Sequence, residues 1–402
     1  MAAAPSQAYC KPVGGNNHCY ALVESTHTYE GTWVDILDSA AAIYESQGRM
    51  QNETWASFGP DEWVEDGVTL GDVGGPNGPH KHTTSPIWFY AGEYPAGSKN
   101  YYEFDYESGP APGVWFYVQE QDAGNGTWCP WLEGGEQPCV AGRPLYTASE
   151  EAGLETAAEV QPYNYGTAYA WGMNLGSGSW SGWASPRGYY SETPEGAKYC
   201  TFGVRWNPSS GLADPGGSGD YAAGAAFGIP NGNPSCEGNG GAAMFAGAPP
   251  TPFGESLTSA SAEGPVPANH AAPTGSALSG SVLAAIATAV ARDDGDSAVA
   301  PSSIAAVQTT LEKAISAAEP ETVMPAEGTE GFNSLLKGAV DFVVLHGHFS
   351  APTAPRPHGE PAPSGTTLEL IVDAHTGWVD GFRLGEGQRA DLGSLGQAVA
   401  LN

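Results

Sequence analysis

The chain has 402 residues, of which 45 are acidic and 14 are basic, so its formal net charge is −31. It has no basic surface to neutralise phosphate, which argues against a nucleic acid or an anionic membrane as a partner. Because no run of about eighteen apolar residues is present, no segment is expected to span a membrane. The 56 Gly, 33 Pro and 10% aromatic residues are typical of a loop-rich β protein.

All cysteines lie in the first part of the chain, at positions 10, 19, 129, 139, 200 and 236. An even number with close pairs predicts disulfides and an oxidising compartment. We favour the pairs Cys10–Cys19, Cys129–Cys139 and Cys200–Cys236, although other pairings fit the same positions. The N-terminal segment lacks the charged and apolar regions of a signal peptide, so we expect a mature, secreted, extracellular protein that begins with an added Met.

Residues 1–206 are predicted to form a disulfide-containing β-sandwich, so the fold class is mainly β. Apolar and polar residues alternate in short segments bounded by Gly, Pro and Asn, which predicts antiparallel strands in two stacked sheets. These segments include HCYALVEST, GTWVDILD, SPIWFYAGEY, NYYEFDY, GVWFYVQEQD, GLETAAEV and TAYAWGMNL. Residues 207–273 are rich in Gly, Ala and Pro and are expected to be loops and a linker.

Residues 274–402 are predicted to form a small α+β accessory domain with a core of its own. Apolar residues at helical spacing predict helices over residues 278–291 and 303–318. Strands are predicted over residues 340–349, 366–374 and 378–384. Three roles are open for this domain: an inhibitor or pro-segment of the sandwich, an attachment module, or a stabiliser. Its ELIVDAHTGWV segment resembles the small helix-plus-sheet domains related to PepSY.

One stretch, QNETWASFGPDEWVEDGVTLGD from Gln51 to Asp72, reads as two strands joined by a tight turn. At a period of two, Trp63, Glu65 and Gly67 share one face of the second strand. A carboxylate between an aromatic residue and a glycine would be partly desolvated, which raises its pKa and suits acid–base chemistry. The alternative is a surface strand in which Glu65 lies beside an exposed Trp.

The order of motifs over residues 29–172 resembles the neprosin family and, more distantly, the eqolisin family of glutamic peptidases. The similar blocks are WVEDGV, SPIWFYAGEYPAG, and GNGTWCPWLEGGEQPCVAGRPLY followed by ETAAEV. The resemblance implies a concanavalin-like β-sandwich and a secreted acid endopeptidase that acts on a peptide or protein substrate. It implies Glu65 as the first catalytic carboxylate and Glu159 as the second. Glu155 is the alternative second carboxylate, because it shares a strand face with Glu159.

The reaction that the resemblance implies needs two carboxyl groups that face each other. The ionised group takes a proton from the attacking water, and the protonated group donates a hydrogen bond to the developing oxyanion. Two such groups held close together share one proton, so activity is expected in acid, without a metal or cofactor. This chain departs from the family pattern before the second carboxylate, where Thr156, Ala157 and Ala158 replace a tryptophan and glycines.

Trp55, Trp63 and Trp88 are the candidate substrate-binding residues. Aromatic rings on a sandwich face also fit a second interpretation, a non-catalytic lectin-like module that binds polysaccharide or peptide. Paired carboxylates on the same fold fit cleavage of a glycosidic bond as well. A weaker alternative is a metal site formed by neighbouring strands, but we predict no metal ligands. Its residues would be His346, His348, Asp373 and His375.

Overall fold

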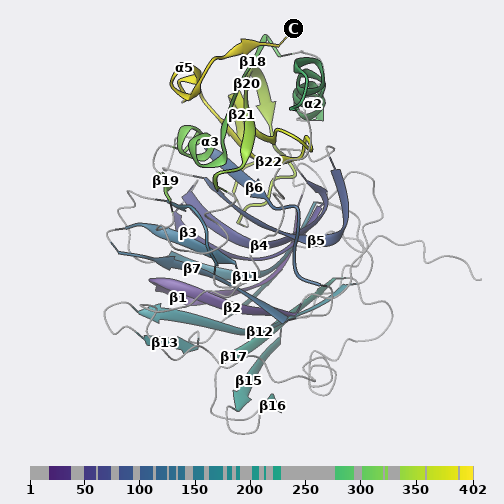
Figure 1. Cartoon of the computed structure of the whole chain (residues 1–402). Helices are drawn as coiled ribbons and strands as arrows, with labels where there is room; N and C mark the ends of the chain where they lie inside the picture. Colours follow the sequence, from purple (N-terminus) through teal and green to yellow (C-terminus); the bar gives the residue numbers. More distant parts are fainter. Residues whose placement is uncertain are drawn as a thin grey trace, which may run out of the picture.

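The computed structural model describes residues 18–37, 49–59, 62–73, 81–93, 100–111, 115–124, 126–132, 135–140, 148–157, 163–174, 179–182, 187–190, 202–207, 212–213, 221–227, 277–293, 301–319, 322–324, 336–357, 360–387 and 390–401. These residues form two antiparallel sheets, with short helices packed on the C-terminal part (Figure 1). The chain is therefore mainly β, as predicted. Within these ranges, no helix has the length and hydrophobicity that crossing a bilayer requires.

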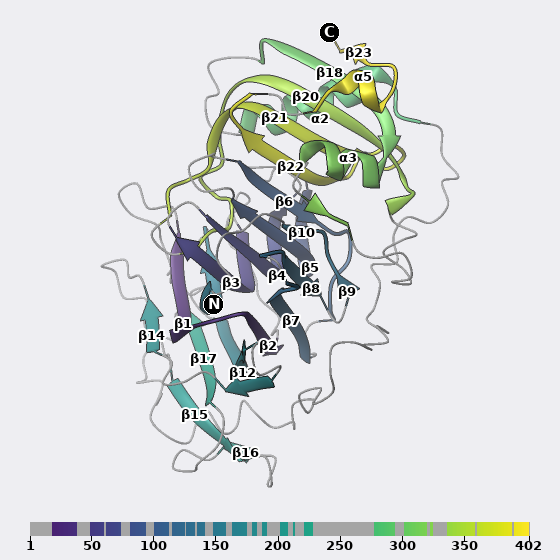
Figure 2. The same ribbon diagram turned by 90° about the vertical axis from the view of Figure 1, so that its left-hand side faces the viewer.

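The first sheet contains twelve of the described strands, in the order β14, β1, β11, β3, β4, β5, β6, β22, β21, β20, β18 and β23. In that order, the strands span Arg187–Tyr190, Cys19–Tyr29, Ala148–Thr156, Arg49–Gly59, Glu62–Val73, Lys81–Glu93, Tyr101–Asp105, Val379–Gly385, Ser364–Asp373, Ala339–Ser350, Ser303–Thr310 and Val399–Ala400. Figure 2 shows these strands following one another from the sandwich into the C-terminal part.

The second sheet has the main order β16, β15, β17, β12, β2, β7, β8, β10 and β19, while β13 pairs with β12 and β9 pairs with β8. The main strands span Leu212–Ala213, Phe202–Asn207, Tyr221–Phe227, Tyr163–Asn174, Gly31–Leu37, Trp115–Asp122, Trp128–Leu132, Cys139–Val140 and Thr322–Val323, and β13 and β9 span Ser179–Gly182 and Gly135–Glu136. The helices are α2 (Gly280–Asp293), α3 (Leu311–Ala318) and α5 (Leu392–Leu395).

The first sheet buries both of its faces. Its inner face carries Val64, Val68 and Trp88 and packs on the second sheet through one large apolar cluster. Its outer face carries the other set of alternating residues, including Trp55 and Trp63, in a second cluster. Both clusters continue into the C-terminal part, where α3 covers the inner face and α2 covers the outer face.

The C-terminal part continues the first sheet and does not have a separate core, contrary to the expectation. Strand β22 pairs with β6, so that Phe382 lies opposite Glu103 and Leu384 lies opposite Tyr101. Phe382 and Leu384 belong to the same apolar cluster as Trp63 of the sandwich. The reason is that β6 would otherwise be an open sheet edge, and an apolar partner strand covers it.

Two element predictions need correction. Residues 303–318 form strand β18 followed by α3, not one helix, because SIAAVQTT pairs along its whole length with β20. Part of the expected linker over 207–273 is strand: β17 pairs with β12 and with β15. Small residues such as those of β17 weaken the alternating pattern, yet their backbone groups still complete a sheet ladder.

The helix predicted over residues 278–291 is confirmed as α2, and the three predicted C-terminal strands are confirmed as β20, β21 and β22. The Cys129–Cys139 disulfide is also confirmed, and it links β8 to β10. Cys10, Cys200 and Cys236 lie outside the described residues, so the other two cysteine pairs stay predictions.

A Gly381→Ala substitution tests whether the sheet is one cooperative unit. A Cβ at Gly381 would lie 2.8 Å from Phe104 Cδ2 and 2.9 Å from the Glu103 carbonyl oxygen of β6. We expect the free energy of unfolding to fall by about 1–3 kcal/mol in a single transition, because overpacking forces the two strands apart. Differential scanning calorimetry measures this change.

The control is Gly280→Ala, because its added methyl group would make an ordinary 3.5 Å contact with Leu401 Cδ2. Its unfolding should match that of the unchanged chain. Two separate transitions in the Gly381→Ala variant, with the sandwich unaffected, would contradict the continuous sheet.

Candidate functional site

Three glutamates from neighbouring strands meet on the outer face of the first sheet: Glu155 of β11, Glu53 of β3 and Glu65 of β4. One carboxylate oxygen from each lies within 4.8 Å of those of the other two. All three residues have an exposed fraction of 0%. We call this group the Glu triad.

The strand registers explain why the Glu triad forms. Glu155 lies opposite Gln51, and Glu65 lies opposite Trp55. Residues directly opposite each other share a face, so Glu53, between Gln51 and Trp55 on β3, is the diagonal neighbour of both glutamates. Gly67 lies opposite Glu53, and a Cβ at Gly67 would lie 2.8 Å from the Glu53 Cβ. The glycine therefore gives Glu53 the room that it needs.

The structure brings Glu65 and Glu155 together. It places Trp55 and Trp63 on the same outer face, both fully buried, so the alternative of Glu65 beside an exposed Trp is wrong. Trp88 lies on the inner face and packs edge-on against Phe116 of the second sheet, away from the Glu triad. Glu159 lies outside the described residues.

The sequence prediction missed Glu53. The signal was present, because the predicted turn between β3 and β4 sets Glu53 and Gly67 opposite each other. For this hairpin, the prediction included only Glu65, the acid of the second strand, which lies in the WVEDGV motif.

Burial and mutual repulsion raise the pKa values of two members of the Glu triad. Burial raises the pKa of Glu53 well above its ordinary value, and the charges of Glu155 and Glu65 raise it further. Burial likewise raises the pKa of Glu65, with contributions from Glu155 and Glu103, while the indole N–H groups of Trp63 and Trp55 oppose the change. These carboxyl groups therefore keep their protons at a pH where ordinary glutamates are ionised.

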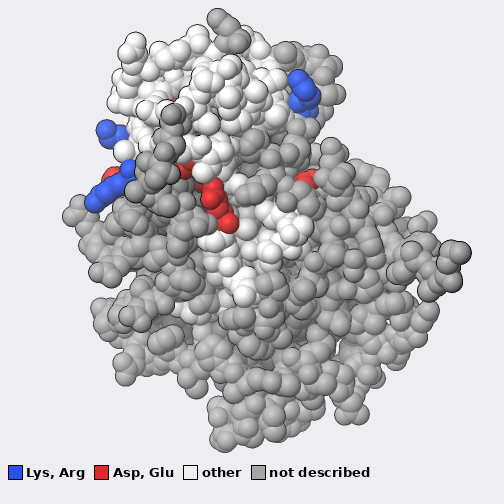
Figure 3. All heavy atoms as spheres, turned by 45° about the vertical axis from the view of Figure 1, so that its right-hand side comes forward, with Lys and Arg blue, Asp and Glu red and all other residues white. Residues whose placement is uncertain are grey.

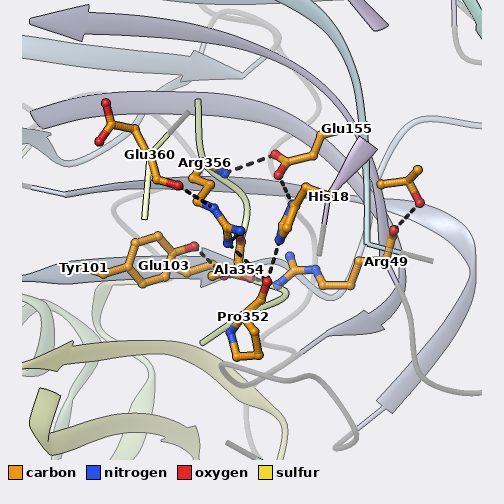
Figure 4. Close-up of polar contacts among 10 residues, drawn as sticks. His18, Arg49, Tyr101, Glu103, Glu155, Pro352, Ala354, Arg356 and Glu360 are labelled. Atoms are coloured by element: carbon orange, nitrogen blue, oxygen red, sulfur yellow. Dashed lines mark hydrogen bonds and ion pairs between the residues drawn. The ribbon is translucent and has the colours of Figure 1, made fainter. Parts of the chain in front are cut away.

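The third member, Glu155, is held by groups from both ends of the chain (Figure 4). The backbone N–H of Arg356 donates to Glu155 Oε2 at 3.0 Å, and His18 Nδ1 contacts Glu155 Oε1. On its other side, His18 Nε2 lies 2.6 Å from the Pro352 carbonyl oxygen. A carbonyl oxygen only accepts, so Nε2 carries a proton. Burial lowers the pKa of His18, while the charge of Glu155 raises it.

Pro352 and Arg356 belong to the connection between β20 and β21, whose residues 351–357 we call the strap. The side chains of Ala351 and Ala354 lie in the apolar cluster that contains Trp55 and Trp63. Ala351, Ala354 and Arg356 are buried, at 0%, 0% and 4% exposed. The strap therefore packs against the outer face and covers Glu155 of the Glu triad.

A second buried network lies beside the Glu triad on the outer face. Arg49 forms an ion pair with Glu103 and approaches Asp105 at 3.6 Å, and Tyr101 Oη donates to Glu103 Oε2 at 2.7 Å. Burial raises the pKa of Glu103 to about 8, although Arg49 opposes the change. Arg49 supplies positive charge close to a region that is otherwise rich in carboxyl groups.

The space between the two sheets holds further buried acids: Asp66 and Glu150 on the inner face of the first sheet and Glu120 on β7 of the second sheet, all at 0% exposed. The backbone N–H of Trp131 donates to Asp66 Oδ2 at 3.0 Å. Burial raises the pKa of each of the three, and mutual repulsion raises those of Glu120 and Glu150 further. Many acids of this chain are therefore hidden, and few acidic side chains emerge among the described residues of the face in Figure 3.

The Glu triad is the one described group of acids whose oxygens lie close enough to ligate a single cation. Carboxylates suit hard cations, but Ca²⁺ and Mg²⁺ take about six or more oxygen ligands, and the triad offers three residues. The other described group combines Glu136 with Cys129 and Cys139, which are joined in a disulfide.

The alternative metal site on β20 and β21 does not form. His346 lies opposite Thr367, whereas Asp373 lies opposite Val340. These positions are six residues apart along β20, which corresponds to about 20 Å. The side chains therefore meet different surroundings: His346 Nδ1 lies near Thr367 Oγ1, and His375 lies near Asp341.

Comparison with known proteins gives structural likeness only. No protein-family model matches the chain, and no curated protein matches it. Scytalido-glutamic peptidase with a peptide-based transition-state analogue has a TM-score of 0.33 and 8% identity, over 53% of this chain and 98% of that chain. The same peptidase with a transition-state analogue inhibitor has a TM-score of 0.34 and 8% identity, over 52% and 98%.

SCP-B, a member of the Eqolisin family in complex with the tripeptide Ala-Ile-His, has a TM-score of 0.32 and 7% identity, over 53% and 98%. Likeness at this level gives no residue-by-residue correspondence. The chemistry of the site therefore rests on the contacts within this chain.

The buried acids predict that the protein is most stable in acid. Glu53, Glu65, Asp66, Glu103, Glu120 and Glu150 have pKa values above those of the unfolded chain. Their stabilisation is complete below about pH 4.5 and is lost as the pH rises through the folded values. The lowered pKa of His18 has the opposite effect, because it reduces the stability of the fold below about pH 6.5. The six acids together outweigh this one histidine.

We expect Tm to fall by several degrees between about pH 4 and pH 8, since ~1 kcal/mol moves the Tm of a domain of 150–250 residues by about 2–4 °C. Glu120→Gln should reduce this dependence, because it removes one buried titrating group. Glu312→Gln, at an exposed position in the first turn of α3, is the control and should leave it unchanged. A Tm that rises steadily over this range would contradict the account.

Proposed function

We propose that the protein is an acid endopeptidase in which Glu65 and Glu155 act on water and the scissile amide. The observation that carries this proposal is the Glu triad itself, three fully buried carboxyl groups whose nearest oxygens lie within 4.8 Å of one another. Carboxyl groups at such distances share protons, so one acts as a base while its neighbour acts as an acid.

Glu155 is the general base in this mechanism. Its Oε2 accepts a hydrogen bond from the backbone N–H of Arg356. This oxygen is therefore oriented to accept a hydrogen bond from a polar ligand. A water held beside Glu155 gives up a proton to this carboxylate as its oxygen attacks the carbonyl carbon. Collapse of the tetrahedral intermediate then breaks the C–N bond, and Glu155 returns the proton to the leaving amine nitrogen. Glu65, whose raised pKa keeps it protonated, donates a hydrogen bond to the developing oxyanion. Glu53 lies between them, and its raised pKa keeps a second negative charge away from Glu155.

The alternatives have less support among the described residues. The described Trp33, Trp55 and Trp88 are all buried, so they form no exposed platform for a polysaccharide. Inverting glycosidases hold their carboxyl groups about 6.5–9.5 Å apart, and retaining ones hold them about 5–5.5 Å apart. The nearest oxygens of the Glu triad lie within 4.8 Å of one another, which argues against the inverting reaction. A peptide or protein is therefore the substrate that we propose, in an oxidising, extracellular setting that the Cys129–Cys139 disulfide suits.

The proposal predicts cleavage of denatured protein at acidic pH once the strap is removed. The assay uses a chain in which Asn-Gly replaces residues 351–363 and joins Ser350 to Ser364, which are already paired across β20 and β21. Glu65→Gln and Glu155→Gln in this chain should each lower kcat/KM by at least ~10²-fold, because each removes a proton-transfer group. Peptide fragments are quantified by mass spectrometry between about pH 3 and 7.

Glu120→Gln is the matched control, because Glu120 is equally buried but lies between the two sheets. Its activity should equal that of the parent chain. No cleavage by the shortened chain at any pH, or equal cleavage by the Glu65→Gln and Glu155→Gln variants, would overturn the proposal.

Chelation gives a separate test of the chemistry. Because the mechanism uses only carboxyl groups and water, dialysis against EDTA should leave the cleavage rate of the shortened chain unchanged. If activity disappears with EDTA and returns with added Ca²⁺ or Mg²⁺, then the Glu triad acts as a metal site and the proposed mechanism is wrong.

A further inference from the structure

We propose that the strap is a built-in inhibitor that occupies the peptide-binding site above the Glu triad and must leave before a substrate can bind. This inference rests on the proposed function. It selects one of the three roles that the sequence left open for the C-terminal part of the chain.

The strap binds through its backbone. The Arg356 N–H donates to the proposed base Glu155, and the Pro352 carbonyl oxygen faces His18 Nε2. One donor and one acceptor of the strap main chain thus satisfy two polar groups of the sandwich. Such contacts are available to any peptide, because every residue except proline carries both groups. The strap therefore uses the interactions that a peptide substrate would use.

Small side chains let the strap lie close to the outer face. Ala351 and Ala354 pack in the apolar cluster of Tyr20, Trp55 and Trp63. These aromatic residues are 0–1% exposed in the intact chain. Ligand sites are usually lined by aromatic and apolar side chains with a few polar groups, and these residues with Glu155 and His18 have that composition.

The strap keeps its shape through Arg356. The guanidinium group donates to the carbonyl oxygens of Pro352, Ala354 and Glu360, at 3.1, 3.3 and 3.1 Å (Figure 4). The Arg356 side chain thus links three carbonyl groups of the connection between β20 and β21. Its side-chain hydrogen bonds go to these groups and not to the Glu triad. A pre-shaped segment binds with a smaller loss of conformational entropy than a flexible peptide, which favours the strap over a substrate.

The strap can leave without unfolding the sheet. It is the connection between β20 and β21, and the pairing of Ser350 with Ser364 closes the hairpin at its base. The Ala351 N–H also donates to the Pro363 carbonyl oxygen at 2.8 Å. Movement beyond this base opens the Glu triad to solvent while the ladder between β20 and β21 stays intact.

The experiment compares four chains in the cleavage assay at acidic pH: the intact chain, the shortened chain, and the full-length variants Arg356→Ala and Arg292→Ala. A short tether gives a local concentration of about 1 mM or more, so a strap that binds with a Kd of ~10 µM would suppress activity by ~10²-fold. We expect this factor between the intact and the shortened chain. Arg356→Ala should be intermediate, and Arg292→Ala, at the exposed end of α2, should match the intact chain.

A binding measurement separates this inference from the proposed function. A synthetic peptide of residues 351–363 is titrated into the shortened chain, and tryptophan fluorescence reports binding near Trp55 and Trp63. We expect saturable binding that is weaker in the Glu155→Gln variant, and inhibition of cleavage with the same Kd. A peptide with Ala at position 356 should bind more weakly.

Each outcome decides one of the two claims. If the intact chain cleaves as fast as the shortened chain, or if the peptide neither binds nor inhibits, the strap is not an inhibitor. If the peptide binds at the Glu triad but no chain cleaves protein, the strap still occupies a peptide site while the peptidase proposal fails.

Discussion

The rest of the structure depends on the removal of carboxyl groups from water. An ionised carboxylate in an apolar interior is strongly unfavourable unless it is paired, so such groups take up protons or find partners. This chain buries Glu53, Glu65 and Glu155 on the outer face of the first sheet and Asp66, Glu120 and Glu150 between the two sheets. Arg49 and His18 offset only part of this charge. Protonation must neutralise the remaining buried carboxyl groups. The same groups therefore lower the stability of the fold when they ionise, and they are available for acid–base chemistry.

Burial at the Glu triad comes from segments that are distant in the sequence. The hairpin of β3 and β4 supplies two glutamates, β11 supplies the third, and residues near His18 and Arg356 cover them. The cover is possible because β22 pairs with β6 and carries the hairpin of β20 and β21 onto the same sheet. The C-terminal part is therefore connected to the site both by a continuous sheet and by the strap.

The sequence predicted the parts of the site that follow from local periodicity. Alternation in WVEDGV placed Glu65 and Trp63 on one face, and the predicted turn after Phe58 gave the hairpin. Glu155 was found as an alternative through a resemblance, while the preferred Glu159 lies outside the described residues. Trp88 was misjudged because alternation separates residues into two faces but does not say which face meets the second sheet.

Other features could not be predicted because they depend on contacts between distant segments. The pairing of β6 with β22 has no local signal, and neither does the docking of an Ala- and Pro-rich connection on Glu155. The segment of β18 was predicted to be helical because its alanines fit both the helical and the strand period. Its pairing with β20 determines that it forms a strand. Buried acids are also hard to recognise in a sequence, since acidic residues are usually exposed.

The most direct measurement is a titration of the individual carboxyl groups of the Glu triad by NMR. The carboxyl carbons of ¹³C-labelled glutamate can be assigned with the variants Glu53→Gln, Glu65→Gln and Glu155→Gln. The account predicts that Glu53 and Glu65 titrate well above the ordinary glutamate pKa of about 4.3 in the intact chain. If both carbons titrate near that ordinary value, the Glu triad is neither desolvated nor coupled, and the basis of the proposed chemistry is contradicted.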